Sequence, residues 1–159
     1  MELRDKVAVI TGGSGGIGKA MATAFLREGT KAVMLADLNE DAVNLAAAEI
    51  GCDGMACDVT NEAQIIALVE ATEAKHGAVD VFCSNAGAGG NGLLTEAENA
   101  VWQQQWELHV MAHLYAARAV LPGMIERGSG YLMNTASAAG LLAALGSGPY
   151  TATKAAAVK

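Results

Sequence analysis

The chain has 159 residues, of which 52% are hydrophobic and 17% charged, and its formal net charge is −7. This composition excludes a disordered chain, and a net negative charge without any Lys/Arg cluster argues against a nucleic-acid partner. Gly occurs 19 times but Pro only twice, without the period of collagen. The length suits one domain, so we expect residues 1–159 to form a single one.

Neither a membrane segment nor an export signal is predicted. The chain has no run of 18 or more apolar residues, the length a spanning helix needs, and its first six residues lead directly into an apolar strand. Cys52, Cys57 and Cys83 have neither C-x-x-C nor zinc-ligand spacing. We therefore expect reduced thiols, no metal site, no membrane partner and a cytoplasmic location.

Short apolar runs alternate with longer segments of helical periodicity along the chain. Strands are predicted at residues 6–10, 31–36, 54–57, 79–83 and 131–135. Helices are predicted at residues 19–28, from Asn39 or Glu40 to 50, from the residue after Asn61 to 76, at 98–127 and from about 150 onward. Asn39 and Asn61 are the predicted N-caps of the second and third helices. This alternation predicts an α/β fold of three layers, a doubly wound parallel sheet (Rossmann fold) of order 3-2-1-4-5. A flavodoxin-like order, 2-1-3-4-5, fits the same pattern.

The long predicted helix at 98–127 has one apolar face, which we expect to pack against the sheet. That face consists of Val110, Leu114, Ala117 and Leu121. Pro122 lies within the helix and should kink its last turns or end it early, because proline removes a backbone donor.

A glycine-rich segment, TGGSGGIG at residues 11–18, lies between the first strand and the first helix. Such a turn lets the backbone approach a pyrophosphate, whose charge is met by the free N–H groups and the positive end of the helix. The segment fits both G-x-G-x-x-G and T-G-x-x-x-G-x-G. Its place between strand and helix favours a dinucleotide site over a flexible turn.

Acidic residues follow the second and third predicted strands. Asp37 lies 19 residues after Gly18, where a carboxylate can bind the ribose hydroxyls of NAD and would repel the 2′-phosphate of NADP. NAD is therefore favoured over NADP, although Asp37 is also a candidate N-cap for the next helix. Asp58 and Val59 follow the third strand and are interpreted either as an adenine contact or as a solvated turn.

Taken together with two later motifs, the chain resembles the short-chain dehydrogenase/reductase family over essentially its whole length. These motifs are SNAG at 84–87, with Ser84 in place of the usual first Asn, and Ser137 followed by YTATK at 150–154. The family's T-G-x-x-x-G-x-G loop selects the second glycine spacing. The resemblance implies NAD-binding roles for Gly12, Ser14, Gly15, Gly16, Ile17, Gly18, Asp37, Asp58, Val59, Asn85, Ala86, Gly87, Tyr150 and Lys154.

Tyr150 and Lys154 are four residues apart, so both side chains lie on one face of a helix. Bringing a phenol from pKa about 10 to about 7 requires roughly 4 kcal/mol, and one ammonium about 5 Å away supplies about 3 kcal/mol at an effective dielectric near 20. The resemblance implies that Tyr150 is the general acid/base, that Lys154 lowers the pKa of its phenol, and that Ser137 positions the substrate oxygen. The implied reaction is hydride transfer between NAD(H) and a secondary alcohol or ketone.

The chain departs from the family pattern at two places. His109 stands where the family has an Asn that completes a proton relay. We interpret His109 as a catalytic candidate that would hold the water of this relay or titrate itself. The alternative is that it only packs within a buried helix. The chain also stops at Lys159, within the predicted last helix, so we expect a truncated member that lacks the C-terminal strands and the substrate-covering loop.

The resemblance further implies a homodimer or homotetramer, formed through residues 98–127 and 150 onward. The apolar loop at 140–145 suggests an apolar wall beside the substrate. Three alternatives stay open: a non-catalytic NAD-binding protein of the same fold, an inactive fragment, and a methyltransferase-type sheet that binds S-adenosylmethionine.

Overall fold

The computed structural model describes residues 2–90, 92–143 and 145–159, so Ala144 of the apolar loop lies outside the described residues. Its centre is a five-stranded sheet in which every neighbouring pair is parallel. The strands are β1 (Val7–Thr11), β2 (Ala32–Asp37), β3 (Asp53–Ala56), β4 (Val81–Ser84) and β5 (Tyr131–Asn134). Their order is β3-β2-β1-β4-β5, which confirms the predicted topology and excludes the flavodoxin-like alternative.

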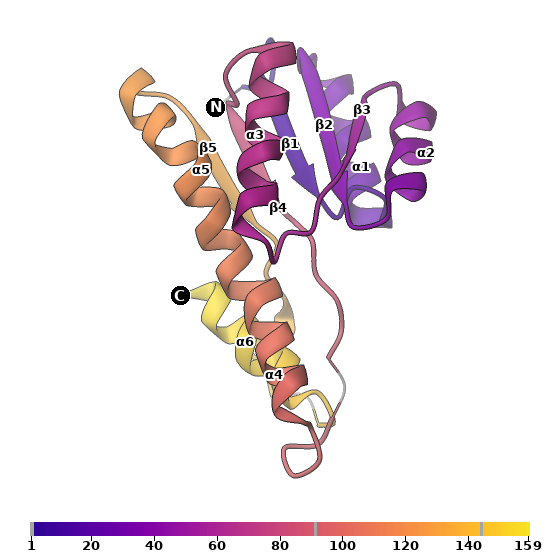
Figure 1. Ribbon diagram of the computed structural model, residues 1–159, viewed down its shortest axis with the longest axis vertical. Helices are drawn as coiled ribbons and strands as arrows, with labels where there is room; N and C mark the ends of the chain where they lie inside the picture. The colour runs from indigo at the N-terminus through magenta and orange to yellow at the C-terminus, as the bar shows by residue number, and fades with distance from the viewer. Residues whose placement is uncertain (1, 91, 144) are drawn as a thin grey trace.

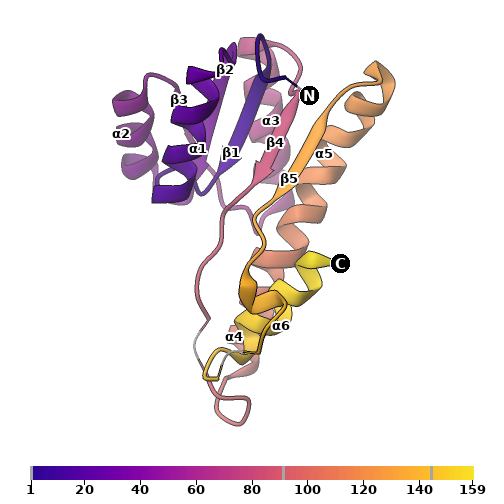
Figure 2. The same ribbon diagram turned by 180° about the vertical axis from the view of Figure 1, so that it is seen from behind.

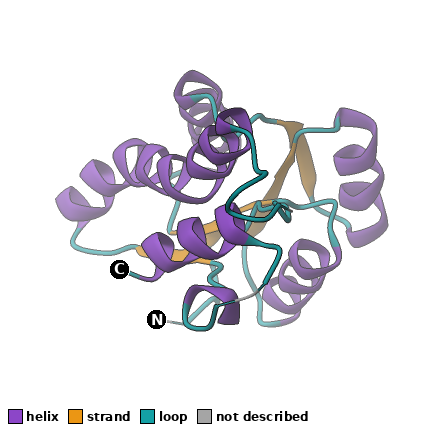
Figure 3. Cartoon of the chain, turned by 90° about the horizontal axis from the view of Figure 1, so that it is seen from below, coloured by secondary structure: helices purple, strands orange, loops and turns teal. Residues whose placement is uncertain are grey.

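Helices cover both faces of the sheet, as Figure 1 and the view from below in Figure 3 show. They are α1 (Gly16–Arg27), α2 (Glu40–Ile50), α3 (Glu62–His76), α4 (Asn99–Trp106), α5 (Ala112–Arg127) and α6 (Gly148–Val158). A π-helical segment, η1 (Glu107–Met111), joins α4 and α5 into one long helix, and a short 3-10 turn, η2 (Ala138–Gly140), precedes α6. In Figure 2, α6 lies beside the lower half of the long helix.

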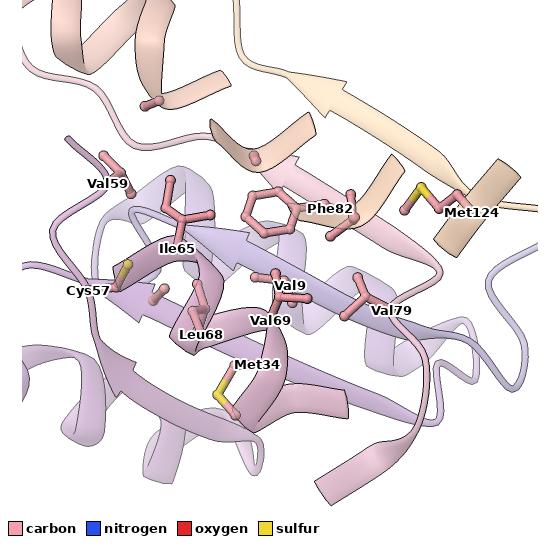
Figure 4. Close-up of a cluster of buried hydrophobic side chains, with 14 residues drawn as sticks. Val9, Met34, Cys57, Val59, Ile65, Leu68, Val69, Val79, Phe82 and Met124 are labelled. Atoms are coloured by element: carbon pink, nitrogen blue, oxygen red, sulfur yellow. The ribbon is translucent and has the colours of Figure 1, made fainter. Parts of the chain in front are cut away.

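Alternation along the buried strands divides the core between the two faces. In β1, Ala8 and Ile10 point toward α1 and α2, whereas Val9 points toward α3 and α5. Successive side chains of a strand point to opposite faces, so a strand that is covered on both sides is apolar throughout. Figure 4 shows the cluster on the α3 and α5 face, in which Phe82 and Ile65 are fully buried.

The predicted helix caps are confirmed. The side-chain oxygen of Asn39 accepts a hydrogen bond from the backbone N–H of Ala42, and that of Asn61 accepts from Ala63. Each bond satisfies a donor that the first helical turn leaves free. The first helix begins at Gly16 rather than at residue 19, so the glycine-rich segment itself supplies the N-terminal turn of α1.

The long helix ends at Arg127, as predicted, so of the two expected effects of Pro122 the early end does not occur. The prediction of its buried face is wrong. The face that packs against the sheet consists of Ala112, Ala116, Val120 and Met124, while Leu114 and Leu121 are 41% and 40% exposed. Alanine carries little weight in a hydrophobic pattern, yet its small side chain allows a helix to approach its neighbours closely.

No helix in the described part of the chain combines the length and the apolar character needed to cross a bilayer. The three cysteines are free thiols. Burial raises the pKa of Cys52 and Cys57 to about 11 and that of Cys83 to about 12. These thiols are therefore protonated at neutral pH.

Candidate active site

A cleft of about 820 Å³ opens at the carboxyl ends of the strands. In a doubly wound sheet, ligands bind at this edge, where the direction of strand progression reverses; here the reversal falls between β1 and β4. Every residue predicted to bind the cofactor lines the cleft: Gly12, Ser14, Gly15, Gly16, Ile17, Gly18, Asp37, Asp58, Val59, Asn85, Ala86, Gly87, Tyr150 and Lys154. Ser137 lies on the same wall.

The glycines of the first loop have distinct steric roles. Gly12 has a φ of +66°, and a Cβ there would lie 2.9 Å from the Cα of Ala86. A Cβ on Gly18 would overlap the carbonyl oxygen of Gly12. Gly16, in contrast, has no atom within 4 Å of the corresponding position. The loop is thus closely packed on the protein side at Gly12 and Gly18 and open at Gly16.

Asp37 is held against the glycine loop. Its Oδ2 accepts hydrogen bonds from the backbone N–H and the hydroxyl of Ser14, at 3.0 and 2.6 Å. Its Oδ1 accepts from the backbone N–H of Leu38 at 2.8 Å. The N-cap of α2 is Asn39 instead, so the carboxylate of Asp37 belongs to the cleft and not to the helix terminus.

Asp58 forms a turn at the end of β3 and also lines the cleft. Its Oδ1 accepts hydrogen bonds from the backbone N–H and the hydroxyl of Thr60, at 2.9 and 2.7 Å. The turn interpretation of Asp58 is therefore correct, and it is compatible with a place beside a ligand.

A chain of hydrogen bonds crosses the ends of three strands. The Asn85 side chain donates to the carbonyl oxygen of Thr11 at 3.0 Å, while its own Oδ1 accepts from the Thr135 hydroxyl at 2.9 Å. The Lys154 Nζ then donates to the carbonyl oxygen of Thr135 at 2.9 Å. Helix α6 is thereby linked through β5 and β4 to the strand that carries the glycine loop.

Tyr150 and Lys154 lie on the cleft side of α6. The Lys154 Nζ is 6.0 Å from the centroid of the Tyr150 ring. Lys154 is only 3% exposed, and burial lowers the pKa of its ammonium below the usual value. Ser137 also faces this region, and its Oγ accepts from the N–H of Ala139 at 3.2 Å.

His109 lies in η1, behind the wall of the cleft, and is fully buried. Its ring packs edge-to-face on that of Tyr150, with centroids 5.3 Å apart and an interplanar angle of 84°. The Ala88 N–H donates to Nε2 at 3.4 Å, and Nδ1 lies 3.0 Å from the Thr153 hydroxyl. Burial, together with the charges of Lys154 and His113, lowers the pKa of His109 to about 4. The ring is therefore neutral at pH 7.

Several cleft residues were not predicted from the sequence. They include Leu38, Thr60, Ala88, Gly89, Gln104, Leu108 and Thr135. Ala88 and Gly89 directly follow the SNAG segment, and Gln104 and Leu108 lie close to His109 on the long helix. Their closeness in sequence to predicted site residues was the one feature that could have indicated them. Thr135 contributes a backbone carbonyl to the Lys154 contact, which no residue pattern reveals.

The chain belongs to the short-chain dehydrogenase family of oxidoreductases, since the family model described as "short chain dehydrogenase" matches residues 6–159. An "uncharacterized oxidoreductase" of Staphylococcus aureus (strain N315) is 36% identical over 157 residues, which cover 97% of this chain and 68% of the relative. Membership of this family excludes the methyltransferase-type alternative.

Solved structures show the same likeness. A short-chain dehydrogenase/reductase from Burkholderia phymatum, in complex with NAD, superposes with a TM-score of 0.94 at 35% identity, covering 99% of this chain and 58% of that one. Levodione reductase gives a TM-score of 0.92 at 29% identity, covering 98% and 63%. The chain thus spans less than two thirds of the length of these two proteins.

Proposed function

We propose that the protein transfers a hydride between NAD(H) and a secondary alcohol or ketone. The observation that carries this proposal is the placement of Tyr150, Lys154 and Ser137 on the wall of the cleft that also contains the glycine loop. The three residues come from two segments, and the sheet edge brings them to one cavity. Family membership supports the reaction class.

The residues of the cleft fit a dinucleotide. The open position at Gly16 leaves space beside the N-terminus of α1, where backbone N–H groups favour a pyrophosphate. Asp37 would accept hydrogen bonds from the adenosine ribose and repel a 2′-phosphate, and Lys154 would contact the nicotinamide ribose. The bound cofactor would supply or accept the hydride. The Burkholderia protein, similar over nearly this whole chain, is in complex with NAD.

The chain's own residues would move the proton. In ketone reduction, the Ser137 hydroxyl donates a hydrogen bond to the substrate oxygen, and the Tyr150 hydroxyl gives that oxygen its proton. In alcohol oxidation, the Tyr150 phenolate takes the proton back. The nearby Lys154 ammonium stabilises the phenolate by charge, and its hydrogen bond to Thr135 holds it in place.

The substitution Tyr150→Phe tests this proposal. It removes the proton donor and keeps the ring, so we expect kcat with secondary alcohols and ketones to fall by about 100-fold or more. NADH binding, followed by fluorescence titration, should remain. Tyr131→Phe is the matched control, because Tyr131 is an exposed residue of β5 outside the cleft. Unchanged turnover in Tyr150→Phe would favour another acid/base, and NADH binding without turnover in the wild type would favour a non-catalytic protein.

We also propose self-association into a homodimer or homotetramer through residues 98–127 and 150 onward. Trp106, Leu114, Leu121 and Ile125 support this, because they leave large apolar side chains exposed on the long helix. The cytoplasmic location inferred from the sequence stays a prediction.

A further inference from the structure

Thr153 makes a contact that the proposed reaction does not use. It lies in α6 between Tyr150 and Lys154, and it is 1% exposed. Its hydroxyl oxygen is 3.0 Å from Nδ1 of His109, which lies in η1, 44 residues away in the sequence. Two buried polar side chains thus meet directly behind the catalytic candidates.

The surroundings of His109 determine which ring nitrogen carries the proton. The backbone N–H of Ala88 points at Nε2, and an N–H group has no lone pair to offer, so Nε2 must accept. On the other side, the Thr153 hydroxyl lies 2.9 Å from the carbonyl oxygen of Pro149 and 3.1 Å from that of Tyr150. Because carbonyls only accept, they take the single hydroxyl proton and leave an oxygen lone pair for Nδ1–H. Both contacts therefore require a proton on Nδ1.

The Nε2 lone pair of His109 lies near Lys154. A Cβ added to Gly87 would be 3.3 Å from the His109 Nε2 and 3.5 Å from the Lys154 Nζ. The two nitrogens therefore flank the small space that the glycine leaves. Because the single Nε2 lone pair already accepts from the Ala88 N–H, Nε2 acts on the ammonium through space as a partial negative charge, whereas an N–H group there would present a partial positive charge and oppose it.

We infer that Thr153 is a positioning residue, which holds His109 in the neutral form with the proton on Nδ1 so that the unprotonated Nε2 presents a partial negative charge toward the Lys154 ammonium. This inference rests on the proposed function, because Lys154 acts there as the cation beside Tyr150. It assigns His109 an effect through Lys154 and through its contact with the Tyr150 ring.

The other charged groups around His109 are consistent with a ring that stays neutral. Lys154 and Tyr150 face it from α6, and His113 on α5 acts on it only when that second ring is protonated. Glu107, in the same π-helical segment, accepts hydrogen bonds from Gln103 and Tyr115 instead. Burial, and after it the charge of Lys154, also lower the pKa of His113 to about 4. Both histidines therefore stay neutral between pH 6 and 8.

Nitrogen NMR of the His109 ring tests the inference without any assay of activity. In the wild type at pH 7 we expect the neutral ring with the proton on Nδ1. Thr153→Ser keeps the hydroxyl and should keep this form, whereas Thr153→Val should shift the ring toward the form with the proton on Nε2. A wild-type ring protonated on Nε2, or charged, would overturn the inference, even if the valine variant does not fold. So would an unchanged ring in a folded Thr153→Val.

The pH profile of alcohol oxidation gives a second readout. A proton on Nε2 replaces the partial negative charge beside Lys154 by a positive one and weakens the ammonium, so the acidic limb of kcat in Thr153→Val should move about one pH unit upward, and Thr153→Ser should restore it. Thr151→Val is the matched control on the same helix and should leave the profile unchanged. Identical profiles for Thr153→Val and the wild type would contradict the inference. If no alcohol is oxidised at all, the proposed function fails, while the NMR result still decides the protonation of His109.

Discussion

At the level of single residues, Ser14 and Asp37 line the cleft and are hydrogen-bonded to each other. Ser14 donates two hydrogen bonds to the same carboxylate oxygen, and the shorter one, from its hydroxyl, is 2.6 Å long. Asp37 therefore provides the negative charge, whereas Ser14 orients the carboxylate that carries it. Two substitutions separate them experimentally.

Asp37→Ala removes the charge that would repel a 2′-phosphate. We expect the affinity for NADPH relative to NADH to rise about tenfold or more, because one lost hydrogen bond to a charged group and one lost repulsion each change binding by more than about 1 kcal/mol. Ser14→Ala keeps the charge and loses only the hydroxyl, so it should weaken NADH binding several-fold without admitting NADPH. Fluorescence titrations with both nucleotides measure this. An Asp37→Ala variant that keeps the wild-type ratio would show that selectivity resides elsewhere.

At the level of elements, an ion-pair cluster joins the end of α3 to the start of β3. The Asp53 carboxylate accepts from the Lys75 Nζ and also contacts the His76 Nε2, each at 2.6 Å. The hydrogen bond from Lys75, with a smaller contribution from His76, holds the pKa of Asp53 below its usual value. Partial burial of the carboxylate acts in the opposite direction and raises this pKa. The cluster therefore ties β3, at one end of the sheet, to the helix that covers it.

Asp53→Asn should reduce the free energy of unfolding at pH 7 by up to about 1 kcal/mol. Since the folded-state pKa is lowered, this stabilisation is present above the unfolded pKa of about 3.9 and is lost as the pH falls through the folded value. Urea titrations at pH 7 and at decreasing pH should show the wild type converging on the variant in acid. Glu126→Gln, which alters an exposed carboxylate on α5, is the control. A pH-independent difference would exclude the ionic origin.

The helices and strands also show which features of the fold can be predicted from the sequence. The sheet order and the caps Asn39 and Asn61 were predictable, because periodicity, short polar caps and right-handed crossovers are local or general rules. The buried face of α5 was not, since its alanines are inconspicuous and the preceding π-helical turn leaves no mark in the hydrophobic pattern. The contact between His109 and Thr153 was not predictable either, because it joins positions 44 residues apart across two packed helices.

At the level of the whole molecule, the exposed apolar side chains of the long helix give self-association a test. Replacing both Trp106 and Leu121 by Glu should convert the proposed dimer or tetramer into monomers, because charges disfavour a desolvated contact. Sedimentation velocity at micromolar concentration measures the change. Leu45→Glu, on α2 at the opposite face of the sheet, alters a leucine that is even more exposed and should leave the assembly intact. A wild-type protein that sediments as a monomer would contradict the proposal.

The hydrogen bond between Lys154 and Thr135 has a consequence for how the protein would lose its activity in denaturant. The side chains of β5 are mostly exposed, and that of Tyr131 is 53% exposed. Segments with few buried apolar contacts open at lower cost than the core. Local opening of β5 would release the lysine while β1 and β2 remain paired. Turnover should then disappear in mild denaturant before the fold melts, in step with amide exchange in β5 and not with exchange in the core.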